Sequence, residues 1–419
     1  MLTEREHLGH PVVNEMRKSG HGPQWVIATA LIALLGACAP GGMQFGSRTL
    51  NMPFPQSDVG SSPRQISSMP AERFGRGPVP VTLILPLSGE PGLAQVGTSM
   101  ANASKLAVAY IEANPNIAEN ITISLRDSGD SVAGASAAAQ AAVAEGAKLI
   151  LGPLRSDQVS AVGAVARAGG VPVIAFSNTG NVAGPGVYLL SVLPDMEMKR
   201  SVQYLREQGR RGLAGIFPAT AYGEAQATAF RQQAIAVGFS PSAVYTFSSV
   251  DEARQIVEQA RPLIESNMID ALFLPDRSTA PSFGVLLGEA GVSADMVQIV
   301  GSAEWAGDKT IISTPQLQGA IYPAVDEAGL NAISLDYQAR FSSAPHPLAT
   351  IAYTATILAN VNTLSLATPP YSPTLMTSPQ GFNGRDGLFR FLGSGKSEYA
   401  LVIKKIGAGG AATVDGAKF

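Results

Sequence analysis

The sequence predicts an α/β protein made of two doubly wound, Rossmann-like lobes with parallel sheets, joined by a hinge. From residue 79 onward, short apolar runs rich in β-branched residues alternate with alanine-rich helical windows. The runs are apolar almost throughout, as expected of parallel strands that are covered on both faces. This alternation occurs twice over segments of comparable size, which indicates two lobes.

The first series of elements predicts the first lobe. Its first helical window places Met100, Ala103, Leu106, Ala107, Tyr110 and Ile111 on one face. The predicted order is the strand VPVTLILPL, a helix near 98–112, the strand ITISLRD, a helix over 132–145, the strand KLILGP, a helix over 157–168 and the strand VPVIAFS.

The second series repeats the same alternation after YLLSVLPD. It consists of a helix around 196–208, LAGIFP, a helix over 222–237, AVYTFS, a helix over 251–266, MIDALFLP, a helix near 282–290 and MVQIVGS. Ligands of open α/β sheets bind outside the carboxyl ends of the strands. Two such lobes place two of these edges opposite each other, so the cleft between the lobes is the predicted ligand site.

Composition excludes several classes of function. The 419 residues carry 29 Lys+Arg and 32 Asp+Glu, so there is no basic surface typical of nucleic-acid binding. Three of the four histidines precede the first apolar segment, which leaves His346 and the single cysteine, Cys38, for any metal or nucleophilic chemistry. His346 stands between two prolines and suits a rigid loop. We therefore expect no metal, no cofactor and no metal-dependent or acyl-transfer enzyme, whereas composition leaves paired-carboxylate chemistry open. Because no motif supports catalysis, we expect a binding protein and no enzyme.

The N-terminal segment predicts export and lipid anchoring. The uncharged run WVIATALIALLGA, from Trp25 to Ala37, is shorter than the approximately 20 residues that span a bilayer and follows Arg17 and Lys18. It ends at Cys38, in a sequence that resembles the bacterial lipobox, where the cysteine is diacylated. Residues 1–37 are therefore the predicted signal peptide, with translation expected to start at Met16. The alternative is a buried N-terminal helix with an inert cysteine.

A tether is predicted between the lipidated cysteine and the body, over residues 38–78. The segment is rich in Gly, Pro, Ser, Met and Gln without helical or strand period. A flexible coil of about 40 residues has a root-mean-square reach of roughly 35 Å, so the body can stand off the membrane. Ala39 replaces the aspartate of the simple inner-membrane retention signal, which favours the outer membrane.

Four ordered stretches carry a resemblance. ILPLSGE, AEGAKLILGPLRSDQVSAVGAVARAGGVPVIAFSNT, FPATAYGEA and FNGRDGLFRFLGSGKSEYALVIKKI resemble the type I periplasmic binding proteins of the leucine/isoleucine/valine branch, over Val79 to about Ile406. The resemblance implies three crossings between the lobes, near Leu193, Ala320 and Thr368. Lobe 1 would then be residues 79–193 plus 320–368, and lobe 2 residues 194–319 plus 369–419.

Candidate ligand residues in the first lobe follow two of its strands. Ser156 and Asp157 come between KLILGP and a helix, so they are predicted N-cap positions beside unsatisfied backbone N–H groups, which bind carboxylates well. An ordinary solvated cap is the alternative. The resemblance implies that this loop and the loop Ser177-Asn178-Thr179 hold a ligand α-carboxylate. Ser88, in ILPLSGE, is a further candidate ligand-binding residue.

The second lobe supplies two more candidates. Tyr222, in the pair Tyr222-Gly223, opens a helix after LAGIFP and matches a tyrosine that closes over the ligand in the resembled family. Packing at a helix start is the alternative. Glu304, in GSAEW, resembles the family's acidic partner for a ligand ammonium group, displaced by one position.

The sequence GKS at Gly395 ends like a Walker A loop but lacks the glycine that this motif requires five positions earlier. It lies between two strand-like runs, so it predicts a hairpin turn.

Two functions of different classes remain open. The first is a lipid-anchored periplasmic receptor that closes over a small amphoteric ligand, an amino acid or related compound, and presents it to an ABC permease. The second is an outer-membrane lipoprotein that activates penicillin-binding proteins, the peptidoglycan synthases, by protein contact; a group of such lipoproteins resembles this chain in PLSG and LILGPL. A shared fold does not distinguish them, because function depends on the site.

Overall fold

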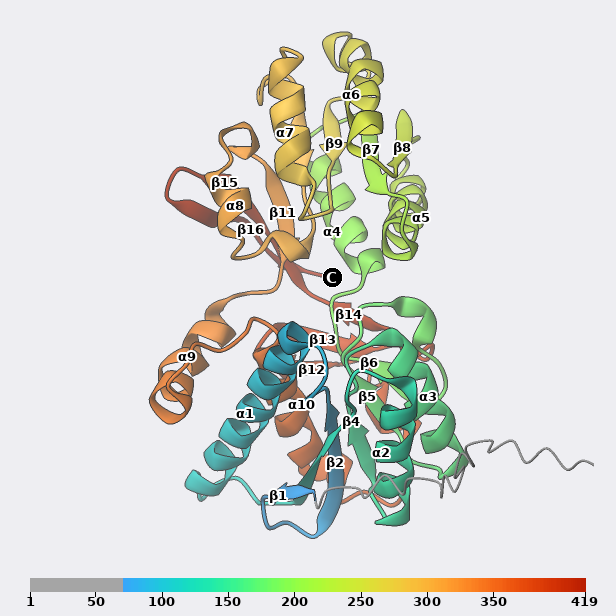
Figure 1. Ribbon diagram of the computed structural model, residues 1–419, viewed down its shortest axis with the longest axis vertical. Helices are drawn as coiled ribbons and strands as arrows, with labels where there is room; N and C mark the ends of the chain where they lie inside the picture. The colour runs from blue at the N-terminus through green and yellow to red at the C-terminus, as the bar shows by residue number, and fades with distance from the viewer. Residues whose placement is uncertain (1–70) are drawn as a thin grey trace, which may run out of the picture. The chain divides into compact units, whose positions relative to one another are not determined.

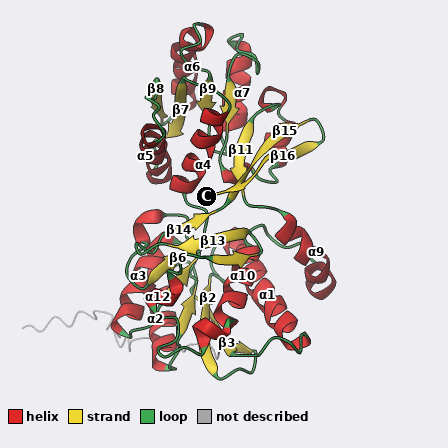
Figure 2. Ribbon diagram, turned by 180° about the vertical axis from the view of Figure 1, so that it is seen from behind, coloured by secondary structure: helices red, strands yellow, loops and turns green. Residues whose placement is uncertain are grey.

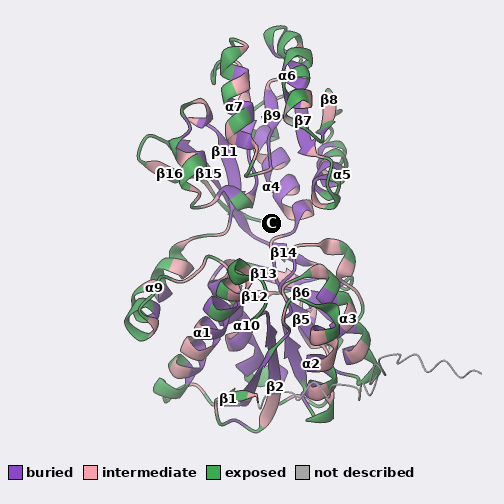
Figure 3. Ribbon diagram, viewed as in Figure 1, coloured by how far each residue is buried: buried purple, intermediate pink, exposed green. Residues whose placement is uncertain are grey.

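The computed structural model describes residues 71–419 and consists of two lobes, each built on a sheet flanked by helices (Figure 1). The predicted signal peptide, Cys38 and most of the tether lie outside the described residues. None of the helices within 71–419 is long and apolar enough to cross a bilayer. Strands of both sheets are largely buried between their helices, as Figure 3 shows.

The first sheet has six strands in the order β1-β3-β2-β4-β5-β6. All neighbours are parallel except β1, which pairs antiparallel with β3. Helices α1 and α10 pack on one face, and α2 and α3 pack on the other. The elements are β1 (Glu72–Phe74), β2 (Val79–Leu85), α1 (Pro91–Ala113), β3 (Ile121–Asp127), α2 (Val132–Ala144), β4 (Leu149–Leu151), α3 (Ser156–Ala168), β5 (Val173–Ala175), β6 (Val187–Leu189) and α10 (Ala349–Asn360).

The second sheet has seven strands in the order β16-β15-β11-β10-β9-β7-β8. Helices α4 and α5 cover one face, whereas α6 and α7 cover the other (Figure 2). Its elements are α4 (Pro194–Glu207), β7 (Leu213–Pro218), α5 (Ala221–Ala236), β8 (Ala243–Phe247), α6 (Val250–Glu265), β9 (Ala271–Phe273), α7 (Ala280–Glu289), β10 (Gln298–Val300), α8 (Lys309–Ser313), β11 (Ile321–Ala324), β15 (Leu401–Gly407) and β16 (Gly410–Lys418). The predicted α/β class with two doubly wound lobes is confirmed.

A third, three-stranded antiparallel sheet packs against the core of the first lobe. It comprises β12 (Phe382–Gly384), β13 (Gly387–Phe391) and β14 (Ser397–Tyr399). The predicted hairpin is confirmed, because β13 pairs antiparallel with β14 and Gly395 adopts φ +82° in the connecting turn. The remaining helices are α9 (Ala328–Phe341), α11 (Asn362–Ser365) and α12 (Pro373–Met376).

Strand pairing moves two of the predicted crossings between lobes. β11 pairs with β10 and β15, so the chain leaves the second lobe after Ala324 rather than near Ala320. Phe389 and Tyr399 belong to the first lobe's apolar cluster, so the last crossing lies near Ala400 rather than Thr368. The sequence predicts strands in the segment 382–399, but it does not show which of the two lobes their aromatic side chains pack against.

The tether also ends earlier than predicted. Residues 72–74 pair with 123–125 of β3 as an edge strand, within the range assigned to the tether. Lys105 on α1 forms an ion pair with Glu72 at 2.8 Å, which holds this short strand from a second side. Three residues are too few to show a strand period in the sequence, so only the partner strand reveals β1.

Replacing Gly329 by alanine is expected to lower the free energy of unfolding by about 1 to 3 kcal/mol. A Cβ on Gly329, near the start of α9, would lie 1.6 Å from the carbonyl oxygen of Arg385 in the β12–β13 turn. The backbone of one of these segments must therefore move. Urea denaturation followed by circular dichroism measures the loss. Gly409→Ala is the matched control, since its Cβ would meet no atom within 4 Å; equal stability of the two variants would contradict this packing.

Candidate functional site

A cavity of about 370 Å³ is lined by residues of both lobes and by the segments that join them. It holds three carboxyl groups, those of Glu197, Glu304 and Asp386, but one guanidinium group, that of Arg277. The other lining residues are Asn178, Ser191, Val192, Tyr222, Ala303, Ala306, Val325, His346, Pro347, Leu348, Thr350, Ile351 and Tyr399. Its wall is therefore apolar in part and carries more acidic than basic groups.

Glu197 is a buried acid in the first turn of α4. Its side chain is 2% exposed and accepts a hydrogen bond from the backbone N–H of Ala303 at 2.9 Å. Burial raises the pKa of Glu197 to about 8; the hydrogen bond from Ala303 opposes this shift, and the charge of Glu304 adds to it. Near neutral pH this group is therefore mostly protonated, and a cation that enters would favour its carboxylate form.

Glu304 is presented by a single 3-10 turn that follows β10. Trp305, the next residue, is fully buried against the second lobe and anchors the turn, whereas the side chain of Glu304 is exposed toward the cavity. Partial desolvation raises the pKa of Glu304 above the usual glutamate value, while Arg277 acts in the opposite direction. Glu197 and Glu304 thus form an acidic pair on the second lobe.

Tyr222 is positioned by the start of α5. Thr220 caps this helix by accepting the backbone N–H of Gly223 at 3.1 Å. A Cβ on Gly223 would lie 2.0 Å from the carbonyl oxygen of Pro218, so only glycine lets the helix start so close to the end of β7. The Tyr222 hydroxyl is buried beside the side chains of Asn178 and Gln226 but makes no hydrogen bond of normal geometry among the described residues, and burial raises its pKa. A ligand can supply that partner.

The first lobe contributes Asp386 and Tyr399. Asp386 lies in the turn between β12 and β13, is 5% exposed and has its pKa raised to about 6 by burial, against a smaller opposing effect of the Thr350 hydroxyl. Tyr399 ends β14 and is 2% exposed; burial raises its pKa, as does the charge of Asp386. Both residues line the same cavity as Glu197, although they are far from it in sequence.

Three of the residues predicted to bind ligand line this cavity, namely Asn178, Tyr222 and Glu304. The cavity lining does not include Ser88, Ser156, Ser177 or Thr179. Ser88 donates to the carboxylate of Asp127 at 2.5 Å. Ser177 is buried and accepts the backbone N–H of Thr179 at 3.2 Å, which shapes the loop that presents Asn178.

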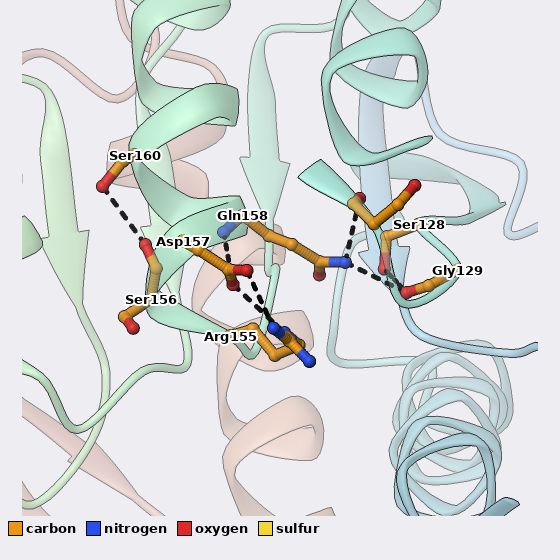
Figure 4. A network of polar contacts seen from close by, with 8 residues as sticks. Ser128, Gly129, Arg155, Ser156, Asp157, Gln158 and Ser160 are labelled. Carbon is orange, nitrogen blue, oxygen red and sulfur yellow. Dashed lines mark hydrogen bonds and ion pairs between the residues drawn. The ribbon is translucent and has the colours of Figure 1, made fainter. Parts of the chain in front are cut away.

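The predicted N-cap of α3 is wrong by one residue. Figure 4 shows Ser156 inside the helix, which begins there with Arg155 as its extended N-cap. The guanidinium of Arg155 donates to the carboxylate of Asp157 at 3.1 and 2.8 Å, and that carboxylate also accepts the N–H of Gln158. Gln158 in turn donates to the carbonyl oxygens of Gly129 and Ser131. An arginine was not an expected cap, so the sequence pattern pointed to the serine.

Sequence reasoning missed Glu197, Asp386 and Tyr399. Glu197 lies in PDMEMKR, which reads as an ordinary charged helix start, and Asp386 and Tyr399 lie in the C-terminal stretch treated as strands. A usable signal was the pair Arg385-Asp386 before Gly387, which forms the two-residue turn between β12 and β13. Within residues 71–419 no group of three or more His, Cys, Asp or Glu side chains could hold a metal ion.

Comparisons with known proteins agree with this architecture. The family model described as periplasmic binding protein matches residues 78–390. Similar solved structures include a Rhodospirillum rubrum protein named for branched-chain amino acid ABC transport, at 19% identity over 80% of this chain and 99% of that one, with a TM-score of 0.69.

Two further similar structures contain ligands. One is an ABC transporter substrate-binding protein of Desulfitobacterium hafniense in complex with Leu, at 17% identity over 80% of this chain and 99% of that one, with a TM-score of 0.61. The other is an ABC transporter solute-binding protein of Rhodopseudomonas palustris with 3,4-dihydroxybenzoic acid, at 18% identity over 81% and 97%, with a TM-score of 0.60. No curated protein matches the chain.

Proposed function

The chain belongs to the periplasmic binding protein family, and from this premise we propose that it is a solute receptor that binds a small amphoteric ligand, an amino acid or derivative, for an ABC transporter. The observation that carries the proposal is the cavity between the lobes, which combines carboxyl groups, a guanidinium and hydroxyls that have no partner among the described residues. The protein acts by binding rather than by catalysis.

Membership of this family implies a periplasmic location. The proposal adds that residues 1–37 direct export, that Cys38 is lipidated and that the segment after it tethers the body to a membrane, with Ala39 favouring the outer membrane. Mass spectrometry of the mature chain tests this, since a diacylated N-terminal Cys38 is the expected terminus. A mature chain that retains residues before Cys38 would contradict it.

Binding is expected to proceed by hinge closure. Tyr222, Glu197 and Glu304 belong to the second lobe, whereas Asp386 and Tyr399 belong to the first, so a ligand touches all of them only when the lobes are close. A ligand with such differential contacts shifts the population toward the closed state. The permease partner would then recognise the closed receptor.

The identity of the ligand must come from the site and not from the fold. The two ligand complexes of the same fold hold leucine in one case and a dihydroxybenzoate in the other. Proteins that share one architecture can thus bind chemically different ligands.

Tyr222→Ala is expected to weaken ligand binding at least tenfold, because it removes a buried ring and the hydroxyl that faces the ligand. Trp25 and Trp305 are the two tryptophans of the chain. In a Trp25→Phe background, tryptophan fluorescence therefore reports on Trp305, in the turn that lines the cavity. The affinity is measured by fluorescence titration of this background, with and without Tyr222→Ala, using a panel of amino acids, and native mass spectrometry identifies the bound ligand. Tyr110→Ala, at a half-exposed tyrosine outside this cavity, is the control; an equal loss there would contradict the assignment.

A second candidate function is activation of a penicillin-binding protein. It is favoured by the position of Ser156, Ser177 and Thr179, which the resemblance assigns to a ligand carboxylate but which do not line the cavity. Solute binding and stimulation of peptidoglycan synthesis, each measured for the unmodified chain and for Tyr222→Ala, separate the two functions. A receptor binds a solute and loses this binding in Tyr222→Ala, whereas an activator binds no solute in either form and retains its stimulation in both. The double variant Ser156→Ala/Thr179→Ala tests whether the loops outside the cavity take part in binding.

A further inference from the structure

Two polar groups on the first-lobe wall of the cavity have no partner in the described part of the chain. They are the carboxyl oxygen Oδ2 of Asp386 and the hydroxyl of Tyr399, whose side chains are 5% and 2% exposed. A buried carboxylate or hydroxyl without a partner is costly, because it has lost its hydrogen bonds to water. Both groups line the ligand cavity, so a bound molecule can restore those bonds.

The cations near this wall are already directed elsewhere. Arg385, the neighbour of Asp386 in the same turn, stacks its guanidinium 5.0 Å from the ring centroid of Tyr353 and lines a different cavity. Arg390 and Lys199, near Tyr399, both pair with Glu398. No ion pair of Asp386 is formed within residues 71–419, so the protein itself supplies no countercharge.

The opposite wall carries a second acidic pole. Glu197 accepts the N–H of Ala303, the residue before Glu304, and the charge of Glu304 raises the pKa of Glu197. Arg277 lies beside Glu304 and also pairs with Asp308 at 3.6 Å. The cavity therefore presents one carboxyl group from the first lobe, and two carboxyl groups and a guanidinium from the second. A ligand with a single ammonium group satisfies the carboxyl groups of one lobe and leaves those of the other without a cation.

We propose that Asp386 and Tyr399 form a subsite for a cationic nitrogen group, so that the ligand carries two such groups joined by a short chain. Asp386 accepts the hydrogen bonds of the ammonium or guanidinium group, and the Tyr399 hydroxyl bonds the same group or the adjacent atoms. The second cation faces Glu197 and Glu304. Basic amino acids meet this description and also offer a carboxylate to Arg277. This inference rests on the proposed receptor function.

The test compares lysine with leucine, which is similar in size but lacks the second cation, by isothermal titration calorimetry of the full chain. Lysine or ornithine is expected to bind at least 30-fold more tightly than leucine. Asp386→Asn is expected to weaken lysine binding at least 30-fold and leucine binding by a much smaller factor, because loss of one member of a buried charge pair leaves the other uncompensated. Asp336→Asn, at an exposed aspartate of α9, is the control that removes one charge elsewhere.

Two outcomes would overturn the subsite. Leucine or benzoate binding more tightly than lysine, with Asp386→Asn without effect, refutes it and leaves the receptor function standing. Binding of no member of the panel, including putrescine and glutamate, removes the receptor function and the subsite together. The selectivity of the unmodified chain decides the matter even if Asp386→Asn folds poorly, and Tyr399→Phe gives a second variant that removes only a hydroxyl.

Discussion

Trp305→Ala is expected to lower the free energy of unfolding by about 3 to 5 kcal/mol, the range for removing a large buried aromatic side chain. The indole is fully buried and packs with Tyr322 at a ring distance of 6.3 Å. The position of Gly301 shows how tight the site is, since a Cβ there would lie 2.2 Å from the indole ring. The surrounding structure cannot collapse easily into the space left behind. Urea denaturation followed by far-ultraviolet circular dichroism measures the loss.

The same substitution is expected to weaken ligand binding, because Trp305 anchors the turn that presents Ala303 and Glu304. Trp305→Phe should recover part of the stability and part of the binding, since it refills most of the space. Leu335→Ala is the control for removal of an apolar side chain, because Leu335 is 80% exposed. If Trp305→Ala and Leu335→Ala are equally stable, the anchoring role assigned to Trp305 is wrong.

Raising the pH from 5 to 9 is expected to lower the free energy of unfolding by roughly 3 to 5 kcal/mol through Glu197. The folded chain raises the pKa of Glu197 to about 8, above its ordinary value of 4.5. Between these values the folded state binds the proton more tightly than the unfolded state, so stability is fully present below about pH 4.5 and is lost as the pH passes through 8. Asp386 adds a smaller loss of the same sign between about pH 4 and 6.

Glu197→Gln tests the origin of this pH dependence, because glutamine keeps the hydrogen bond to Ala303 and cannot ionise. Chemical denaturation at several pH values should show a nearly flat profile from pH 6 to 9 in this variant. The charged and titratable groups that face Glu197 are Glu304 and Tyr222. Glu258→Gln, at an exposed glutamate of α6, should keep the slope of the unmodified chain. An unchanged slope in Glu197→Gln would assign the effect to another group.

A cationic ligand should reverse part of this loss. Binding of an ammonium group beside Glu197 favours the carboxylate, so the ligand stabilises the protein more at pH 8 than at pH 6. The stabilisation by a basic amino acid and by a neutral one can be compared at both pH values. This comparison links the acidity of the cavity to the class of solute that the receptor takes.

Local signals predicted much of the fold. The alternation of apolar runs with alanine-rich windows marked the parallel strands and their helices, because a strand covered on both faces must be apolar on both. Gly395 marked a hairpin turn, and the pair Tyr222-Gly223 marked a helix start close to a strand end. Each of these features depends on residues that are neighbours along the chain, so composition and spacing reveal it.

The assignment of segments to lobes could not be predicted in the same way. The residues of β12 to β14 are compatible with packing against either lobe. In the structure Phe389 and Tyr399 pack in the apolar cluster of the first lobe, so these strands belong to it. The short strand at 72–74 exists because β3 offers it an edge. These outcomes depend on what lies opposite a segment in space.

The sequence by itself determined the α/β class and the two-lobed series, because hydrophobic period and chain order suffice for these, and it predicted the cleft between the lobes as the place for a ligand. Only the tertiary structure decided which polar groups face the cavity. Glu197, Asp386 and Tyr399 come from chain segments up to about 200 residues apart. Their burial arises only when the two lobes and the sheet β12–β14 enclose them. This burial shifts their pKa values and leaves Oδ2 of Asp386 and the Tyr399 hydroxyl without partners among the described residues.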